Sequence, residues 1–73
     1  MGKPIDLKFD FDEIWIPSVQ RMLEKEEQHL TYLKTFIGKV PDSIINRYID
    51  SSMESARLYR QRIQEYKEYS SNL

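Results

Sequence analysis

Apolar residues recur along most of this chain at alternating steps of three and four positions, the period of a helix packed against another helix. The pattern predicts two long helices, over residues 17–37 and 41–69, separated by a short turn at Gly38. Glycine most readily takes the left-handed conformation that ends a helix, and Pro41 suits the first turn of the next helix. The sequence therefore predicts an all-α fold, an antiparallel two-helix hairpin formed by residues 17–73.

One apolar stripe on each predicted helix forms the contact between them. The short turn forces a register in which the numbers of facing residues sum to about 80. Leu30 then faces Ile49 and Leu23 faces Ala56, so the apolar positions match along the whole length. The stripe on the first helix comprises Val19, Met22, Leu23, Leu30, Leu33 and Ile37, and that on the second comprises Ile45, Ile49, Ser52, Ala56, Tyr59, Ile63 and Tyr66.

A different pattern precedes the first helix. Ile5, Leu7, Phe9 and Phe11 alternate with polar residues, as in a half-buried extended segment. Because a single strand has nothing in this chain to pair with, it must lie across the helices, pair with its own copy or extend a partner's sheet. The favoured interpretation is that residues 1–16 form an extended N-terminal arm and helix approach, which covers the open end of the hairpin.

The composition is typical of a folded chain outside the membrane. Hydrophobic residues make up 40% and charged residues 32%, and 11 basic against 12 acidic side chains leave a net charge of -1. This balance supplies no global field to attract nucleic acid or an anionic membrane. The sequence has no cysteine, no signal-peptide pattern and no apolar run near the roughly 20 residues of a membrane span, so we expect a cytoplasmic protein without disulfides.

A second set of large apolar side chains remains outside the predicted stripes. One hairpin cannot bury both sets, so something else must cover the second. The favoured prediction is that two copies pair into a four-helix bundle, because a two-fold contact buries the surplus face of both chains. A helix of another protein that docks in the same place needs the same residues and stays an alternative. The predicted partner interface consists of Tyr32, Phe36, Ile44, Tyr48 and Leu58.

Glu26 and His29 form a Glu-x-x-His pair, the helical spacing of the di-iron carboxylate bundles. Metal binding would bring two copies of this pair together in a dimer, each supported by a carboxylate from the second helix. The carboxylate at the right height, Glu54, points outward, and so short a pattern often arises by chance. The favoured interpretation is that Glu26 reaches Ser52 or solvent and that the chain needs no cofactor, with a metal-binding bundle as the alternative.

Four basic side chains interleaved with tyrosines form the only basic cluster. Such a stripe could contact phosphates while the tyrosines stack on bases, which makes nucleic-acid binding an alternative function. In the predicted register the cluster lies beside acidic residues of the N-terminal half, so its charge can be neutralised within the hairpin or across a dimer. The near-zero net charge favours neutralisation. The candidate nucleic-acid contacts are Arg57, Arg60, Arg62 and Lys67.

No group of residues has the spacing that catalysis requires. The chain has one histidine, no cysteine and no pair of carboxylates placed to face each other in a pocket, so no general acid or base can be assigned. We therefore predict a non-catalytic protein, a small regulator or adaptor that acts as a homodimeric or partner-bound helical bundle. In size and pattern alone, the chain is similar to small helical regulators and adaptors of bacteria and their phages.

Overall fold

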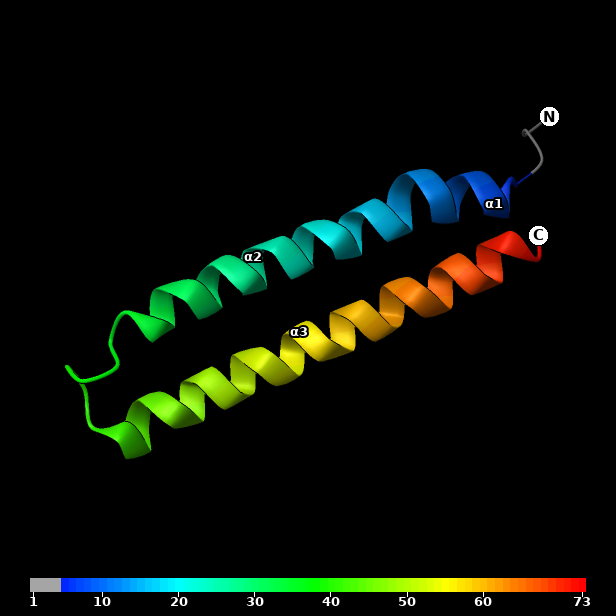
Figure 1. The fold of residues 1–73 in the computed structure, drawn as a ribbon. Coiled ribbons are helices and arrows are strands. Elements are labelled where there is room, and N and C mark those ends of the chain that lie inside the picture. Colours follow the sequence, from blue (N-terminus) through cyan, green and yellow to red (C-terminus); the bar gives the residue numbers. More distant parts are fainter. Residues whose placement is uncertain (1–4) are drawn as a thin grey trace.

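A computed structural model describes residues 5–73, and almost all of this part of the chain is helical (Figure 1). The elements in chain order are α1 (Leu7–Asp10), the π-helical turn η1 (Phe11–Trp15), α2 (Ile16–Lys34) and α3 (Asp42–Ser71). The first three follow one another without a break and form one continuous helical segment. The predicted all-α class is confirmed, since the described residues contain no strand.

The helices α2 and α3 lie side by side and run in opposite directions, so that α1 and the last turn of α3 share one end of the molecule (Figure 1). We call this the open end, and the opposite end, with residues 35–41, the turn end. The described contacts between the helices follow the expected register, because Ser52 bonds to Glu26 and Tyr66 packs on Trp15. The molecule is slender, with principal extents of 59 × 21 × 14 Å.

The contact between the helices buries most of the predicted stripe residues. All seven predicted positions on α3 are buried or half-buried, as are four of the six on the first helix. The two exceptions are Met22 and Ile37, which are exposed. Ile37 lies beyond the end of α2, and Met22 is three positions from the buried Val19, which places it about 60° away from that residue around the helix.

The turn between the helices is longer than predicted. The first helix ends at Lys34 rather than at residue 37, and the Thr35 hydroxyl donates to the Tyr32 carbonyl at 2.7 Å, one turn back. Gly38 has a φ of 84°, the left-handed conformation predicted for it. The second helix begins directly after Pro41, as expected.

The predicted extended arm is wrong where the structure describes it. Leu7–Trp15 are helical, and residues 1–4 lie outside the described part of the chain. Apolar residues at every second position also include pairs four apart, which lie on one face of a helix. In the helix Phe11 packs against Tyr66 and Tyr69 of α3, and the backbone groups bond within the segment instead of lacking a strand partner.

Two local signals favour this helical start. Asp6 caps α1, since its side-chain oxygen accepts a bond of 3.0 Å from the Phe9 amide. Lys8 and Asp12, one helical turn apart, form an ion pair at 3.3 Å that an extended chain could not make. Both signals are present in the sequence, but the prediction rested on the alternation of apolar and polar residues alone.

The π-helical turn η1 lets the helical segment pass through Pro17. A proline inside an α-helix lacks the amide donor, and its ring clashes with the carbonyl four residues back. Just before Pro17, the Ile16 amide bonds to the Phe11 carbonyl, five residues back, which widens this turn. The Ser18 hydroxyl donates a hydrogen bond of 2.6 Å to the Ile14 carbonyl. The proline therefore lies inside the helical segment and does not begin it.

Candidate protein interface

The predicted partner interface is largely open to solvent. Tyr32, Ile44, Tyr48 and Leu58 are exposed by 60%, 50%, 59% and 47%. Phe36 is half-buried and meets the Tyr32 ring edge-on, with the ring centroids 5.1 Å apart. These large side chains are thus uncovered within the single chain.

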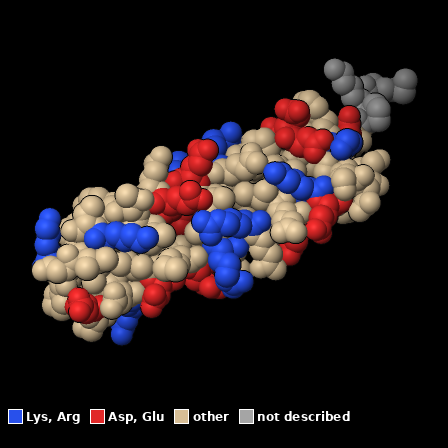
Figure 2. Space-filling model, viewed as in Figure 1, with Lys and Arg blue, Asp and Glu red and all other residues tan. Residues whose placement is uncertain are grey.

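The exposed set gathers on one side of the helix pair. At about 100° per residue, Ile44, Tyr48 and Leu58 lie on the side of α3 opposite Arg60. On that other side Arg60 pairs with Glu27 of α2 at 3.5 Å, and Figure 2 shows basic and acidic side chains interspersed there. The molecule therefore has a charged face and, turned away from it, a face on which these apolar side chains gather, with Arg62 as a basic side chain among them. We call this second face the outer apolar face.

The structure adds members to this surface that the sequence analysis missed. Met22, Trp15 and Tyr69 are each more than two-fifths exposed and share the side of Tyr48 by helical period. Met22 had been assigned to the buried stripe, and Trp15 to the helix approach. Extending the helical period through residues 7–16 would have found Trp15, and the period of the two predicted helices already places Met22 and Tyr69 on this side. The outer apolar face consists of Trp15, Met22, Tyr32, Phe36, Ile44, Tyr48, Leu58 and Tyr69.

An aromatic cluster closes the open end. Phe11 lies at its centre, with ring centroids 4.9 Å from Trp15, 5.4 Å from Tyr66 and 5.0 Å from Tyr69. These tilted and edge-on contacts are the favoured arrangements of aromatic pairs. Because Trp15 and Tyr69 stay half exposed, the cluster both joins the helices and continues the outer apolar face.

A polar contact at the open end joins the helical start to the last turn of α3. Ser70, which is only 2% exposed, donates its hydroxyl hydrogen bond to Asp12, and the Lys8 ammonium donates to the Ser70 carbonyl at 3.3 Å. The hydrogen bond from Ser70, together with the nearby Lys8 charge, lowers the pKa of Asp12 below its ordinary value. A cation at the last carbonyls of α3 also suits the negative end of the helix dipole.

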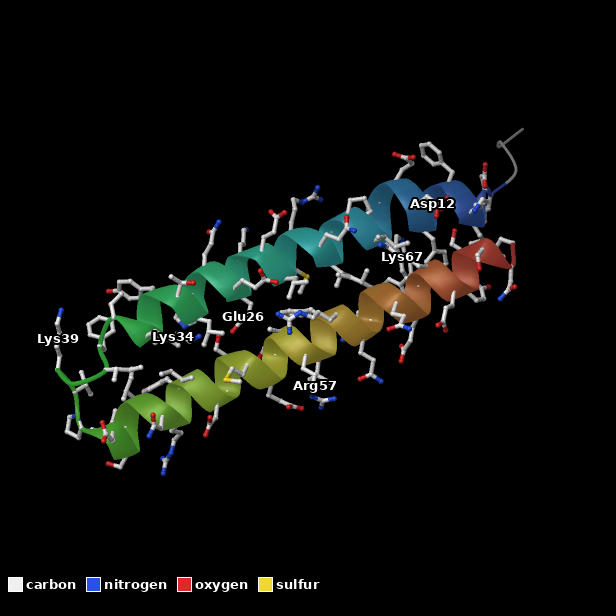
Figure 3. All side chains as sticks on the ribbon, in the orientation of Figure 1. Asp12, Glu26, Lys34, Lys39, Arg57 and Lys67 are labelled. Carbon is white, nitrogen blue, oxygen red and sulfur yellow. The ribbon has the colours of Figure 1, made fainter. Side chains whose placement is uncertain are left out.

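The structure turns Glu26 toward α3 (Figure 3). His29 is exposed. The Ser52 hydroxyl donates to the Glu26 carboxylate at 2.7 Å, so the expected Glu26–Ser52 contact is confirmed. Glu54 is engaged by both nitrogens of the Arg57 fork. Among residues 5–73, no three histidine or carboxylate side chains converge on a common point that could hold a metal ion.

The basic side chains of α3 do not form a single stripe. Arg60 and Lys67, seven residues apart, share one side of the helix, whereas Arg62 is about 200° around from Arg60. Arg57 pairs with Glu54 on its own helix and Arg60 with Glu27 across the pair, which accords with the expected neutralisation although the acidic partners differ. Nucleic-acid binding by these four residues stays a prediction.

A shallow groove of about 470 Å³ runs along the charged side of α3 and reaches Leu30 of α2. The small side chain of Ala56 and the neighbouring Leu30 form part of its floor, and Arg57 and Arg60 stand at its rim. Both guanidinium groups are already paired with carboxylates. The outer apolar face is consequently the stronger candidate for an interaction surface.

No protein-family model matches this chain, and neither the curated proteins nor the solved structures contain a significant match. Within the described part of the chain, no helix combines the length and the hydrophobicity required to cross a membrane. The function is therefore inferred from the geometry of the described residues.

Proposed function

We propose that this protein is a non-catalytic interaction module, a small regulator or adaptor, whose helix pair acts as a hairpin and associates with a second copy. The outer apolar face is the contact surface, and the product is a four-helix bundle. Two-fold association buries the same face on both chains and leaves the two charged faces outward. The paired charges of Glu27 and Arg60 then stay in solvent, so association does not have to desolvate them.

The surface area of the chain carries this proposal. A compact monomer of 8.8 kDa exposes about 4,800 Å² by the scaling of folded proteins. This chain exposes 5958 Å². The excess of about 1,200 Å² exceeds the roughly 800 Å² that each partner buries in a standard protein interface. One further copy supplies enough contact to cover the excess.

The test compares solution masses of the parent chain and of two variants, Tyr48→Glu and Leu58→Glu, by light scattering over a range of concentrations. We expect the parent to have twice the 8.8 kDa chain mass and both variants to be monomers. A carboxylate at position 48 must be desolvated within an apolar contact without a partner, which opposes association. Leu58→Glu is the less sharp of the two variants, because Arg62 lies one helical turn away on the same side, the spacing at which a carboxylate and a basic side chain form an ion pair. Circular dichroism checks that the variants stay helical.

Met53→Glu is the matched control, because Met53 is 52% exposed but lies on the charged side of α3. It should leave the dimer intact. A helical parent chain that stays monomeric at several hundred micromolar would overturn the proposal. Equal dissociation by Met53→Glu and Tyr48→Glu would overturn the assignment of the contact to the outer apolar face.

A further inference from the structure

Large side chains on the outer apolar face are spaced evenly about its middle. On α3, Tyr48 precedes Leu58 by 10 positions and Tyr69 follows it by 11. At 1.5 Å per residue, both tyrosines lie about 15 to 17 Å from Leu58, in opposite directions. The two tyrosines of this face are therefore placed nearly symmetrically about Leu58 along α3.

The other half of the molecule repeats this spacing. In the register that Glu26 and Ser52 define, the numbers of facing residues sum to 78, so Met22 stands level with Ala56 and within about 3 Å of the level of Leu58. Tyr32 follows Met22 by 10 positions, and Phe11, the centre of the open-end aromatic cluster, precedes it by 11. A two-fold axis perpendicular to the helices at this mid-point would bring the aromatic side chains of the turn end onto the open-end cluster of the second copy. If the two copies ran in the same direction, each end would face the same end of the other copy, and an even spacing about the mid-point would not be needed.

The charges of the two ends are opposite in sign. The turn end carries three cations against one carboxylate, and the helical start at the open end carries four carboxylates against one cation. Figure 3 shows Lys34 and Lys39 toward one end and Asp12 toward the other. Copies that run in opposite directions bring unlike ends together, whereas copies that run in the same direction bring like charges together. The residues concerned are Lys34, Lys39, Arg47 and Asp42 at the turn end, and Asp6, Asp10, Asp12, Glu13 and Lys8 in the helical start at the open end. The end of α3 beside that start adds Glu65, Glu68 and Lys67, so the open end stays negative.

We infer that the two copies pair in opposite directions, with the two-fold axis passing by Met22 and Leu58 and with Tyr48 of each copy packed against Tyr69 of the other. This inference rests on the proposed dimer and adds its internal geometry. The turn end of each copy covers the half-exposed Trp15 and Tyr69 of the other, so each end of the bundle combines one turn with one aromatic cluster.

A distance between spin labels tests the direction. The chain has no cysteine, so Lys39→Cys provides a single attachment site at the turn. Opposite directions place the two labels about 50 Å apart or more, close to the 59 Å length of one chain. Pairing in the same direction places them at one end, about 20 Å apart at the spacing of packed helices. Arg21→Cys, an exposed mid-length site, is the control and should give a short distance in either direction.

The possible results distinguish a failure of the inferred pairing direction from a failure of the proposed dimer. A long distance at position 39 with a short one at position 21 supports opposite directions. Short distances at both positions overturn the inference and leave the dimer standing. No distance between chains at either position, together with a monomeric mass, overturns the proposed function itself.

Disulfide cross-linking provides an independent measurement. Mixing Tyr48→Cys with Tyr69→Cys and oxidising should yield mainly mixed cross-linked pairs, because a disulfide forms only when the Cα atoms approach within about 7 Å. In this arrangement the two copies of position 48 lie about 30 Å apart, so Tyr48→Cys alone should cross-link at least about tenfold less. Predominant cross-linking of Tyr48→Cys with itself would overturn the inference.

Discussion

Ser52 illustrates how one small polar side chain can serve the packing of two helices. It is 4% exposed, and its size lets α2 and α3 approach closely at mid-length. Its hydroxyl is bonded to the half-buried Glu26 carboxylate, so neither polar group is left without a partner. The helical period alone places both residues at the contact, which is why their pairing could be predicted.

Replacing Ser52 should show how much stability is lost when the Glu26 carboxylate has no hydrogen-bond donor. We expect Ser52→Ala to lower the free energy of unfolding by about 1 to 2 kcal/mol, because the Glu26 carboxylate loses its donor in a half-buried position. Asn46→Ala, at an exposed position on the charged side of the same helix, should change it by less than about 0.5 kcal/mol. Urea unfolding measures both. If Glu26→Leu combined with Ser52→Ala regained none of the lost stability, the loss would not come from the unpaired carboxylate.

Asp12 should make the open end sensitive to acid. Its pKa in the folded chain lies below the ordinary value of 3.8, chiefly because Ser70 donates a hydrogen bond to it. Its contribution is therefore complete above pH 3.8 and is lost as the pH falls through the lowered pKa. Asp12→Asn should melt below the parent at pH 7, and the gap should shrink on acidification below pH 4, in thermal unfolding followed by Trp15 fluorescence. Asp10→Asn, which leaves Ser70 untouched, is the control and should show no such closing gap.

The helical start at Leu7–Trp15 shows how one sequence pattern can fit two kinds of element. Strict alternation predicts a strand with Ile5, Leu7, Phe9 and Phe11 on one face. The structure separates these side chains, since Phe11 is half-buried in the aromatic cluster and Phe9 is 55% exposed. The tertiary contact with α3 and the Asp6 cap outweighed the local alternation.

Comparison of two phenylalanines distinguishes the helix from the strand. In the helical segment, Phe11→Ala should lower the free energy of unfolding by about 2 kcal/mol, because three aromatic contacts are lost from a half-buried site. Phe9→Ala should change it by no more than about 0.5 kcal/mol. Chemical unfolding measures both variants. Equal losses would indicate that the two rings share a buried face, as in the extended arm.

The slender shape leaves the isolated chain with little interior. Its radius of gyration is 17.1 Å, against about 11 Å for a compact domain of this length. Seven side chains in the described part of the chain are buried. A molecule with so small an interior gains stability from any contact that covers its outer apolar face.

Thermal stability should accordingly depend on protein concentration. Association with a second copy stabilises the folded state by mass action, so the melting temperature of the parent should rise by several degrees between micromolar and millimolar chain. Tyr48→Glu should remove this dependence. Calorimetry at three or more concentrations measures it, and a melting temperature of the parent that stayed constant over this range would contradict the prediction.

The sequence by itself determined the all-α class, the turn at Gly38 and the placement of Glu26 within reach of Ser52, because these follow from helical period and from a short connection; the structure decided between Ser52 and solvent as the partner of Glu26. Which residues began the helical segment was decided by tertiary structure. The Phe11 ring gains its partners only when α3 lies beside it, and Pro17 is tolerated only because the preceding turn widens. The place of Trp15 on the outer apolar face likewise emerged only once residues 7–16 were placed on a helix, since the face on which a side chain lies depends on the element that carries it.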